Sequence, residues 1–281
     1  MKKLVYLSII ALVTTFFISC TNDSLEISNE KFTSNQVSRV GTDALGTGAK
    51  IVDLYVIAGD VNAIGTTKNG IPATNNPKVR LSPAFLTGMQ FKGWKSLSRN
   101  SQNFHYGAEI ELGRMKALQG KNVAILKYGV KDTKMSYWLN GVNGLNAAIN
   151  AAVANLKSQG HTVRVSGVAW FQGDSDTVYP TDANAYAGRL STVLGKVKST
   201  ANAINKANGF GNVTKYAIGL NGECGIVSLE TIVKNAQKKY AAANGHSWMH
   251  LVTYDVDHVG YVALSSNNAY MYVGRDLANL L

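Results

Sequence analysis

The stretch "DLYVIAGDVNAIG", residues 53–65, decides the fold, because it is the clearest buried β-strand in the chain and it ends at a Gly-Asp turn. The run LYVIA is apolar throughout, as expected for a strand that is covered on both faces. Small and polar residues follow at once, and they favour a turn and a loop. The stretch therefore predicts a buried strand with a polar loop at its carboxyl end.

Short β-branched runs alternate with longer amphipathic runs from Ile51 to the end of the chain. The predicted strands are IVDLYVIA (51–58), NVAILKYGV (122–130), TVRVSGVAWF (162–171), KYAIGL (215–220) and HLVTYD (250–255). The predicted helices lie at residues 107–118, 144–160, 183–200, 226–245 and 267–281, and several have a glycine just past their end. This alternation predicts an α/β fold, a three-layer α/β/α sandwich around a five-stranded parallel sheet.

A parallel sheet of this kind binds ligands beyond the carboxyl ends of its strands, so a functional site is expected there. The segment from Thr66 to Asn103 has few strand or helix signals. A connection of that length usually covers or shapes a binding site. Trp94 in this segment and Tyr106 just after it are aromatic residues that could contribute to such a site, although packing against the core is the commoner fate of such residues.

The N-terminal sequence "MKKLVYLSIIALVTTFFISC", residues 1–20, resembles a bacterial lipoprotein signal peptide. Two lysines precede an apolar run that ends at Ser19-Cys20, and Cys20 would carry the lipid after cleavage. An ordinary secretory signal or a short membrane anchor is the alternative. Residues 21–50 are rich in Ser, Thr, Asn and Gly and are expected to form a flexible tether. Residues 51–281 are then expected to form one catalytic-size domain.

The composition limits the classes of partner. The 281-residue chain has a formal charge of +11, which indicates attraction to anionic surfaces or to acidic substrates such as acidic sugars. No recognisable nucleic-acid-binding module accompanies this charge, so no nucleic-acid partner is expected. Cys224 has no second Cys or His at metal-site spacing and is expected to be a small packing residue, and no metal or other cofactor is expected.

Asp255 and His258 lie three residues apart, directly after the last predicted strand. An aspartate that orients an imidazole leaves the second ring nitrogen free to accept a proton, so the pair could be the second half of a nucleophile-base-acid relay. Such a pair also arises by chance, and Asp255 or Asp257 could simply cap a helix.

Four short blocks at predicted strand ends occur in one order: GDVN (59–62), HYGAE (105–109), FQGDSD (171–176) and DVDH (255–258). Together they resemble the SGNH or GDSL-like hydrolase superfamily, and most closely the sialate O-acetylesterase-like carbohydrate esterases. Those proteins carry GQSN, FGPE, QGES or QGEA followed by D, and D-x-x-H at the corresponding strand ends. The resemblance extends from about Ile51 to the C-terminus and implies a flavodoxin-like SGNH hydrolase fold.

The resemblance assigns roles to individual residues. It makes His258 the general base and Asp255 its orienting carboxylate, and it makes Gly107 a backbone donor of the oxyanion hole. It also implies that Gln172 adds a further donor and that Asn62, next to Asp60, braces the first turn. The alternatives are a helix-start glycine for Gly107, a turn residue for Gln172 and a loop cap for Asn62.

The departures from the family pattern surround the same pocket. Val61 occupies the position of the nucleophilic serine, and its side chain has no atom that can attack an ester. The family's GGTS block is replaced by KDTK, residues 131–134, which adds charge and bulk. The sequence VGYVAL follows His258 where the family has a polar turn. These differences indicate a diverged substrate pocket.

Other groups could replace the missing nucleophile. Ser175 is expected to make a structural hydrogen bond, and the Asp60 side chain is expected to point away from the pocket because strand side chains alternate. Thr66, Thr67 and Thr133 have no supporting motif. Water activated by His258 is the remaining candidate. Loss of a serine nucleophile costs roughly a million-fold in turnover, so efficient catalysis is not expected.

Two functional interpretations follow from these observations. The first is a membrane-anchored carbohydrate O-acetylesterase-like hydrolase with weak or absent activity, and the second is a non-catalytic glycan-binding pseudo-esterase. In both, the expected partners are an acetylated glycan or another carbohydrate ester, and the membrane through lipid on Cys20. The expected location is the bacterial cell envelope, at the outer membrane or cell surface.

Overall fold

The computed structural model describes residues 48–65, 76–82, 94–97, 107–220, 226–251 and 267–281. All of them belong to one unit, Val40–Leu281. The predicted signal peptide lies outside the described residues, as does nearly all of the predicted tether. Within the described ranges, no helix is both long enough and apolar enough to cross a membrane.

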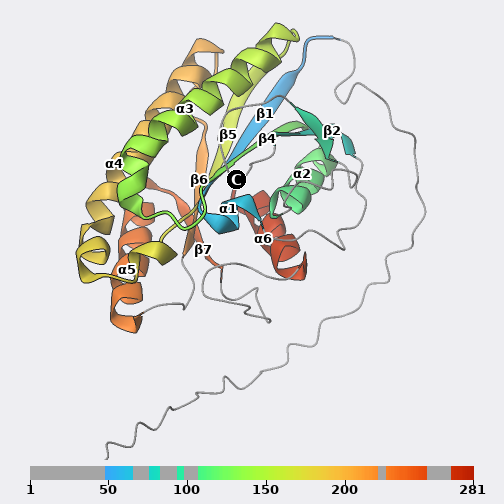
Figure 1. Ribbon diagram of the computed structural model, residues 1–281. Coiled ribbons are helices and arrows are strands. Elements are labelled where there is room, and N and C mark those ends of the chain that lie inside the picture. Colours follow the sequence, from blue (N-terminus) through green and yellow to red (C-terminus); the bar gives the residue numbers. More distant parts are fainter. Residues whose placement is uncertain (1–47, 66–75, 83–93, 98–106, 221–225, 252–266) are drawn as a thin grey trace, which may run out of the picture. The chain divides into compact units, whose positions relative to one another are not determined.

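A seven-stranded sheet forms the centre of the fold, in the order β3-β2-β4-β1-β5-β6-β7 (Figure 1). The strands are β1 (Ile51–Gly59), β2 (Asn76–Ser82), β3 (Lys95–Leu97), β4 (Asn122–Gly129), β5 (Thr162–Phe171), β6 (Lys215–Leu220) and β7 (Ser247–His250). Every pairing is parallel except the one between β2 and β3. The five strands from β4 to β7 form the predicted parallel sheet, in which β1 is central and buried along almost its whole length.

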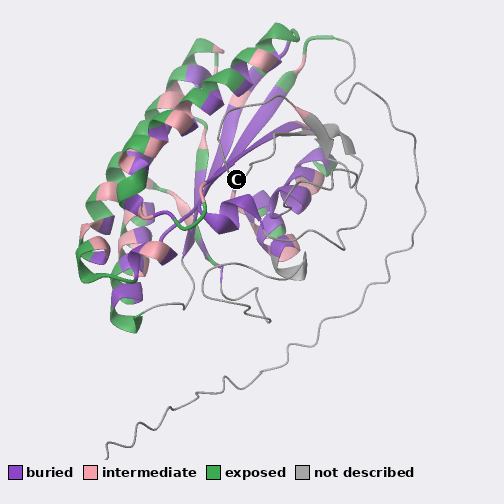
Figure 2. Ribbon diagram, in the orientation of Figure 1, coloured by how far each residue is buried: buried purple, intermediate pink, exposed green. Residues whose placement is uncertain are grey.

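Helices cover both faces of the sheet, which makes the three-layer sandwich that the sequence predicts (Figure 1). On one face α3 (Met135–Ser158), α4 (Pro180–Ala207) and α5 (Val227–Asn244) pack in a core built around Trp138 and Trp170. On the other face α2 (Glu109–Leu118) and α6 (Asn267–Leu280) enclose a smaller core, which includes Ala63 of the short helix α1 (Val61–Ile64). Strands β4, β1, β5 and β6 are buried almost throughout, and β7 has one buried residue, whereas the helices alternate between buried and exposed faces (Figure 2).

The predicted elements match the structure closely, with local differences. Strands β2 and β3 occur in the segment for which the sequence has few strand signals, so the sheet has two more strands than predicted. The structure starts α3 at Met135, nine residues before the predicted residue 144, because Trp138 and Val142 add a further buried stripe. The last strand is β7 at 247–250, and residues 252–255 of the predicted strand lie outside the described residues.

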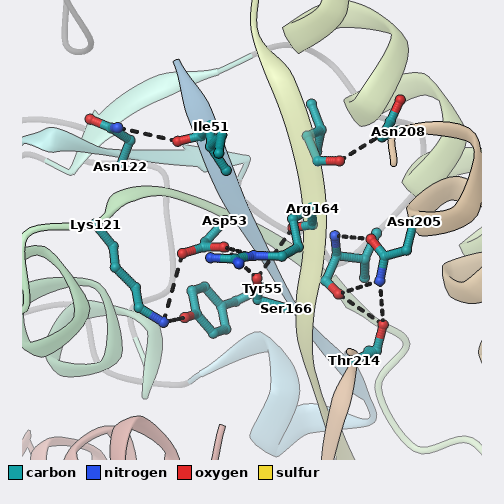
Figure 3. A network of polar contacts seen from close by, with 12 residues as sticks. Ile51, Asp53, Tyr55, Lys121, Asn122, Arg164, Ser166, Asn205, Asn208 and Thr214 are labelled. Atoms are coloured by element: carbon teal, nitrogen blue, oxygen red, sulfur yellow. Dashed lines mark hydrogen bonds and ion pairs between the residues drawn. The ribbon is translucent and has the colours of Figure 1, made fainter. Parts of the chain in front are cut away.

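A polar network fixes the register of β1 against β5 at the amino ends of these strands (Figure 3). The buried carboxylate of Asp53 accepts hydrogen bonds from Arg164 Nε and Ser166 Oγ, both at 2.6 Å, and Lys121 Nζ lies 3.7 Å away. The pairing shifts between Leu54 and Tyr55, and Ser166 is the additional residue of the resulting bulge. Burial alone would raise the pKa of Asp53, but the hydrogen bonds from Arg164 and Ser166 and the nearby charges lower it overall.

Candidate active site at the carboxyl edge of the sheet

Three neighbouring strands end at one level. Gly59 of β1 is in register with Gly129 of β4 on one side and with Phe171 of β5 on the other. The segments that follow these strands therefore meet at one edge, where a parallel sheet places its ligand. This is the edge at which the sequence predicts the functional site.

Gly59 makes the turn after β1 possible. Its φ of +138° is a conformation that residues with a side chain rarely adopt, and a Cβ atom at this position would lie 1.9 Å from the carbonyl oxygen of Phe171. The same carbonyl accepts a hydrogen bond from the Asp60 N–H at 2.7 Å. The chain thus turns sharply and stays attached to β5 at the point where the nucleophile position begins.

Helix α1 starts directly after this turn, with Asp60 as its N-cap. The Asp60 Oδ1 atom accepts a hydrogen bond from the Asn62 N–H at 3.3 Å. Val61 is the first residue of the helix and is 7 % exposed, and Asn62 is also buried. The structure therefore places Asp60, Val61 and Asn62 in a tight strand-to-helix turn at the carboxyl edge, with a valine at the position where the sequence resemblance predicts a nucleophile.

Asp60 is an unusual carboxyl group because it is only 1 % exposed. Its Oδ2 atom has no hydrogen-bond partner among the described residues. Burial raises the pKa of Asp60 well above its ordinary value, and the negative charges of Asp174, Asp132 and Asp176 raise it further. These effects favour the protonated form of Asp60, which is a poor nucleophile.

Gln172 follows β5 and connects the segments after β4 and β5. Its Nε2 atom donates to the Thr133 carbonyl at 2.9 Å and to Asp176 Oδ2 at 2.7 Å, so both amide protons are engaged. Its backbone carbonyl accepts hydrogen bonds from Tyr186 Oη at 2.8 Å and Gln237 Nε2 at 2.9 Å. In this conformation Gln172 is a structural connector, and its predicted role as an oxyanion donor requires one of these bonds to be exchanged.

Asp176 joins the same group from the 3₁₀ helix η1 (Asp174–Asp176). Its Oδ2 atom also accepts the N–H of Met135, the first residue of α3, at 2.8 Å. The hydrogen bonds from Gln172 and Met135 lower its pKa, but burial outweighs them and raises the pKa to about 6. Asp176 can therefore change its protonation state near neutral pH, and it caps a helix of the neighbouring layer at the same time.

Gly107 lies close to Gly65 at the end of α1, because a Cβ atom on Gly107 would be 3.1 Å from the Gly65 Cα atom. Its N–H donates to Glu109 Oε1 at 3.0 Å. The same oxygen pairs with Lys127 Nζ at 2.8 Å, and both side chains are at most 1 % exposed. The predicted oxyanion donor is thus held by a buried ion pair between α2 and β4.

The other predicted residues either lie outside the described residues or make structural hydrogen bonds. Asp255 and His258 lie outside the described residues, as do Asp257, Thr66, Thr67, Tyr106 and Cys224. Thr133 is described, and its hydroxyl donates to the Val130 carbonyl at 2.8 Å and accepts from Trp138 Nε1 at 3.0 Å. These two bonds give the Thr133 hydroxyl a structural role. Among the described residues, no group of three or more His, Cys, Asp or Glu side chains is arranged to hold a metal ion.

Two features of the site have only weak signals in the sequence. Lys127 is the single charged residue in the run VAILKYG, and a lone lysine in a buried strand indicates a buried partner without identifying it. Asp176 is one of two aspartates in the GDSD block, and the sequence contains no signal for its distant bond to Met135. Both roles depend on contacts across more than one element.

Comparisons with known proteins agree with this architecture. Residues 52–244 match a family model described as carbohydrate esterase, sialic acid-specific acetylesterase. The chain is similar in structure to a protein from Arabidopsis thaliana, with 13 % identity, a TM-score of 0.60, and coverage of 81 % of this chain and 96 % of that one. No curated protein matches the chain.

Two further solved structures are similar to the chain. A carbohydrate acetylesterase from Xanthomonas citri has 16 % identity and a TM-score of 0.54, with coverage of 80 % of this chain and 55 % of that one. NanS has 12 % identity and a TM-score of 0.54, with coverage of 82 % and 96 %. At these identities the structures support the fold, whereas the family match, which spans well over half of the chain, supports membership. The chain therefore belongs to the carbohydrate esterase family of sialic acid-specific acetylesterases.

Proposed function

We propose that this protein recognises O-acetylated glycans at the carboxyl edge of its sheet and hydrolyses them very slowly or not at all. One observation carries the proposal: Val61 is the first residue of α1, directly after the Gly59-Asp60 turn. The turn is of the kind that presents a nucleophile, but the Val61 side chain has no lone pair or acidic proton. The backbone of the turn is retained, and the hydroxyl group that would attack the ester is absent.

The hydrogen bonds around the turn support the same proposal. Both amide protons of Gln172 are engaged with Thr133 and Asp176, and the Gly107 N–H is engaged with Glu109. Stabilising an oxyanion would require these donors to be free and aimed at the developing charge. Asp60 is also a poor replacement nucleophile, because burial and neighbouring carboxylates raise its pKa.

A weak esterase is the second candidate function, and the Asp255-His258 pair in the sequence favours it. In this case His258 would remove a proton from water, and the water oxygen would attack the acetyl carbonyl. The acetate and the free sugar hydroxyl would be the products. Without a covalent intermediate, turnover would fall far below that of a serine esterase.

We further propose that the protein is exported and held at the cell envelope by lipid on Cys20. The support is the lipoprotein-like pattern of residues 1–20. Cys20→Ser is expected to move the protein from the membrane fraction to the soluble fraction of expressing bacterial cells, and to abolish incorporation of labelled palmitate. If the variant keeps both membrane attachment and label, the anchor lies elsewhere.

Binding and acetate release, measured together on the full chain, test the proposed function. Chemically acetylated xylohexaose and O-acetylated N-acetylneuraminic acid are titrated into the protein in a calorimeter, and acetate is quantified in the same samples after incubation. We expect measurable binding of at least one acetylated compound, weaker binding of its deacetylated form, and acetate release close to the rate without protein. Absence of binding would contradict glycan recognition, and rapid acetate release would show that another nucleophile operates.

A further inference from the structure

Two exposed tyrosines lie just outside the candidate site, in the segments that follow β4 and β5. Tyr137 is 46 % exposed and Tyr179 is 55 % exposed, and Val178 beside it is 50 % exposed. Lys134 lies between the two segments, with its Nζ atom 4.4 Å from the centre of the Tyr179 ring. We call Lys134, Tyr137, Val178 and Tyr179 the tyrosine rim. Exposed apolar residues that gather in one place often mark a contact site.

Two residues of the rim occupy N-cap positions, where a residue with a short polar side chain would stabilise the helix better. Lys134 is the N-cap of α3 and Tyr179 is the N-cap of α4, and neither side chain makes a capping hydrogen bond. Ser, Thr, Asp or Asn at an N-cap commonly stabilises a helix by about 1 kcal/mol. Neither N-cap side chain supplies this contribution, although Asp176 caps α3 from η1, and the two positions instead bring a lysine and a tyrosine into contact with each other.

Charged side chains hold the rim in place. Lys134 Nζ pairs with Asp182 Oδ2 at 2.8 Å, and Arg189 pairs with the other oxygen of Asp182 at 2.9 Å. Because Lys134 covers one side of the Tyr179 ring, the exposed part of that ring keeps a defined orientation. Tyr137 packs edge-on against the buried Trp138, with ring centres 5.6 Å apart. Both tyrosine rings are therefore presented to solvent by anchored neighbours.

Hydrogen bonds of the residues next to Lys134 connect the rim to the candidate site. The carbonyl of Thr133, next to Lys134, accepts the hydrogen bond from Gln172, and the N–H of Met135 donates to Asp176. Those bonds tie the segments after β4 and β5 together at their bases. Tyr137 follows Met135 by two residues and Tyr179 follows Asp176 by three, so both exposed tyrosines lie close to this junction, whereas Val61, which follows β1, is almost fully buried. The rim is therefore a neighbour of the candidate site.

We propose that the tyrosine rim is a subsite for the sugar units that adjoin the acetylated unit of an oligosaccharide. This inference rests on the proposed function and deepens it, because it makes an extended glycan, rather than a single acetylated sugar, the preferred ligand. A tyrosine ring offers an apolar face to the C–H face of a sugar and a hydroxyl to its polar groups, and it has little conformational entropy to lose. Lys134, Asp182 and Arg189 provide hydrogen-bonding groups at the same place.

Calorimetric titration of the full chain with acetylated xylohexaose and with O-acetylated N-acetylneuraminic acid tests the subsite. Tyr179→Ala and Tyr137→Ala are each expected to weaken binding of the hexasaccharide by roughly tenfold, as for the loss of one well-packed aromatic contact. Binding of the monosaccharide is expected to stay within about twofold, because one sugar unit does not reach the rim. Tyr179→Phe and Tyr137→Phe keep the ring and are expected to retain most of the affinity.

Trp248→Ala is the matched control, because Trp248 is 41 % exposed and also lies under a lysine, with Lys238 Nζ 4.8 Å from its ring centre. It belongs to β7, away from α3 and α4, and its loss is expected to leave both affinities unchanged. Thermal melting of each variant separates lost contacts from lost structure.

The possible results are distinguishable. Unchanged hexasaccharide binding in both alanine variants, with the wild-type chain binding normally, would overturn the subsite and leave the proposed function standing. Equal losses for the hexasaccharide and the monosaccharide would also overturn it, because the rim would then belong to the primary site. If the wild-type chain binds neither compound, the proposed function fails and the subsite fails with it.

Discussion

At the residue scale, the turn after β1 is fixed by its backbone, whatever side chain follows it. Gly59 and Asp60 retain the backbone geometry, through the positive φ of Gly59 and the bond from the Asp60 N–H to Phe171. Val61 then places a branched apolar side chain where the resemblance of the sequence predicts a serine. The turn is thus maintained by contacts that do not depend on the residue at position 61.

Gly59→Ala is expected to destabilise the protein by more than about 3 kcal/mol, because the new methyl group adds a clash with Phe171 to an unfavourable φ. Urea denaturation followed by circular dichroism gives the free energy of unfolding. Gly160→Ala is the matched control: Gly160 has a φ of +82°, but nothing lies within 4 Å of its Cβ position. Its expected loss is about 1 kcal/mol, from strain alone. Equal losses at the two positions would show that contact with Phe171 is unimportant.

At the element scale, the strands and helices of the parallel core were predictable because each carries a strong local pattern. The run LYVIA in β1 and the glycine at position 245 after α5 are examples, and Gly245 does adopt a positive φ. Strands β2 and β3 were missed because NPKVRLS has only two alternating apolar residues and KSL only one, and their pairing with the sheet makes them strands. Short edge strands of this kind depend on tertiary contacts.

The order of the blocks predicted that Asp60, Val61 and Asn62 follow β1 and that Gln172 follows β5, and the structure has both arrangements. The sequence could not show that the donors of Gln172 and Gly107 are engaged. Those bonds depend on Thr133, Asp176 and Glu109, whose side chains or carbonyls reach the site through the tertiary fold. The catalytic roles of Asp255 and His258 stay predictions.

The ion pair between Glu109 and Lys127 joins α2 to β4, and its loss should affect both elements. Lys127→Met is expected to lower the free energy of unfolding by about 3–5 kcal/mol, because it leaves a buried carboxylate without its cation. Glu109→Gln together with Lys127→Met removes both charges and is expected to recover a large part of this loss. Chemical denaturation of the wild type, both single variants and the double variant gives the coupling between the two residues. Additive losses would show that the two charges act independently.

At the scale of the whole molecule, the half-buried His246 and the buried Asp176 are expected to change the free energy of unfolding with pH in opposite directions. Burial lowers the pKa of His246, which stacks on Tyr216, from 6.5 to about 4. The unfolded chain therefore binds this proton more readily, and the contribution of His246 is present above about pH 6.5 and is lost as the pH falls toward 4. Burial raises the pKa of Asp176 from 3.8 to about 6, so its contribution is present below 3.8 and is lost as the pH rises through 6.

The variants His246→Phe and Asp176→Asn should separate these opposite contributions. His246→Phe is expected to make stability rise less steeply with pH between 4 and 6.5, and Asp176→Asn to make it rise more steeply between 3.8 and 6. The measurement is urea denaturation at half-unit pH steps from 3.5 to 7.5. If the free energy of unfolding changes with pH equally in the wild type and in a variant, the substituted residue does not contribute to the pH dependence.

The central claim is that Val61 occupies the position of a nucleophile, and hydrolysis of 4-nitrophenyl acetate by Val61→Ser tests it most directly. The wild type and the size control Val61→Ala are expected to stay near the uncatalysed rate. Val61→Ser is expected to raise kcat/KM by about a thousand-fold or more, since loss of a serine nucleophile costs roughly a million-fold, and adding His258→Ala should remove this gain. Rapid hydrolysis by the wild type, or equal rates for Val61→Ser and Val61→Ala, would contradict the claim.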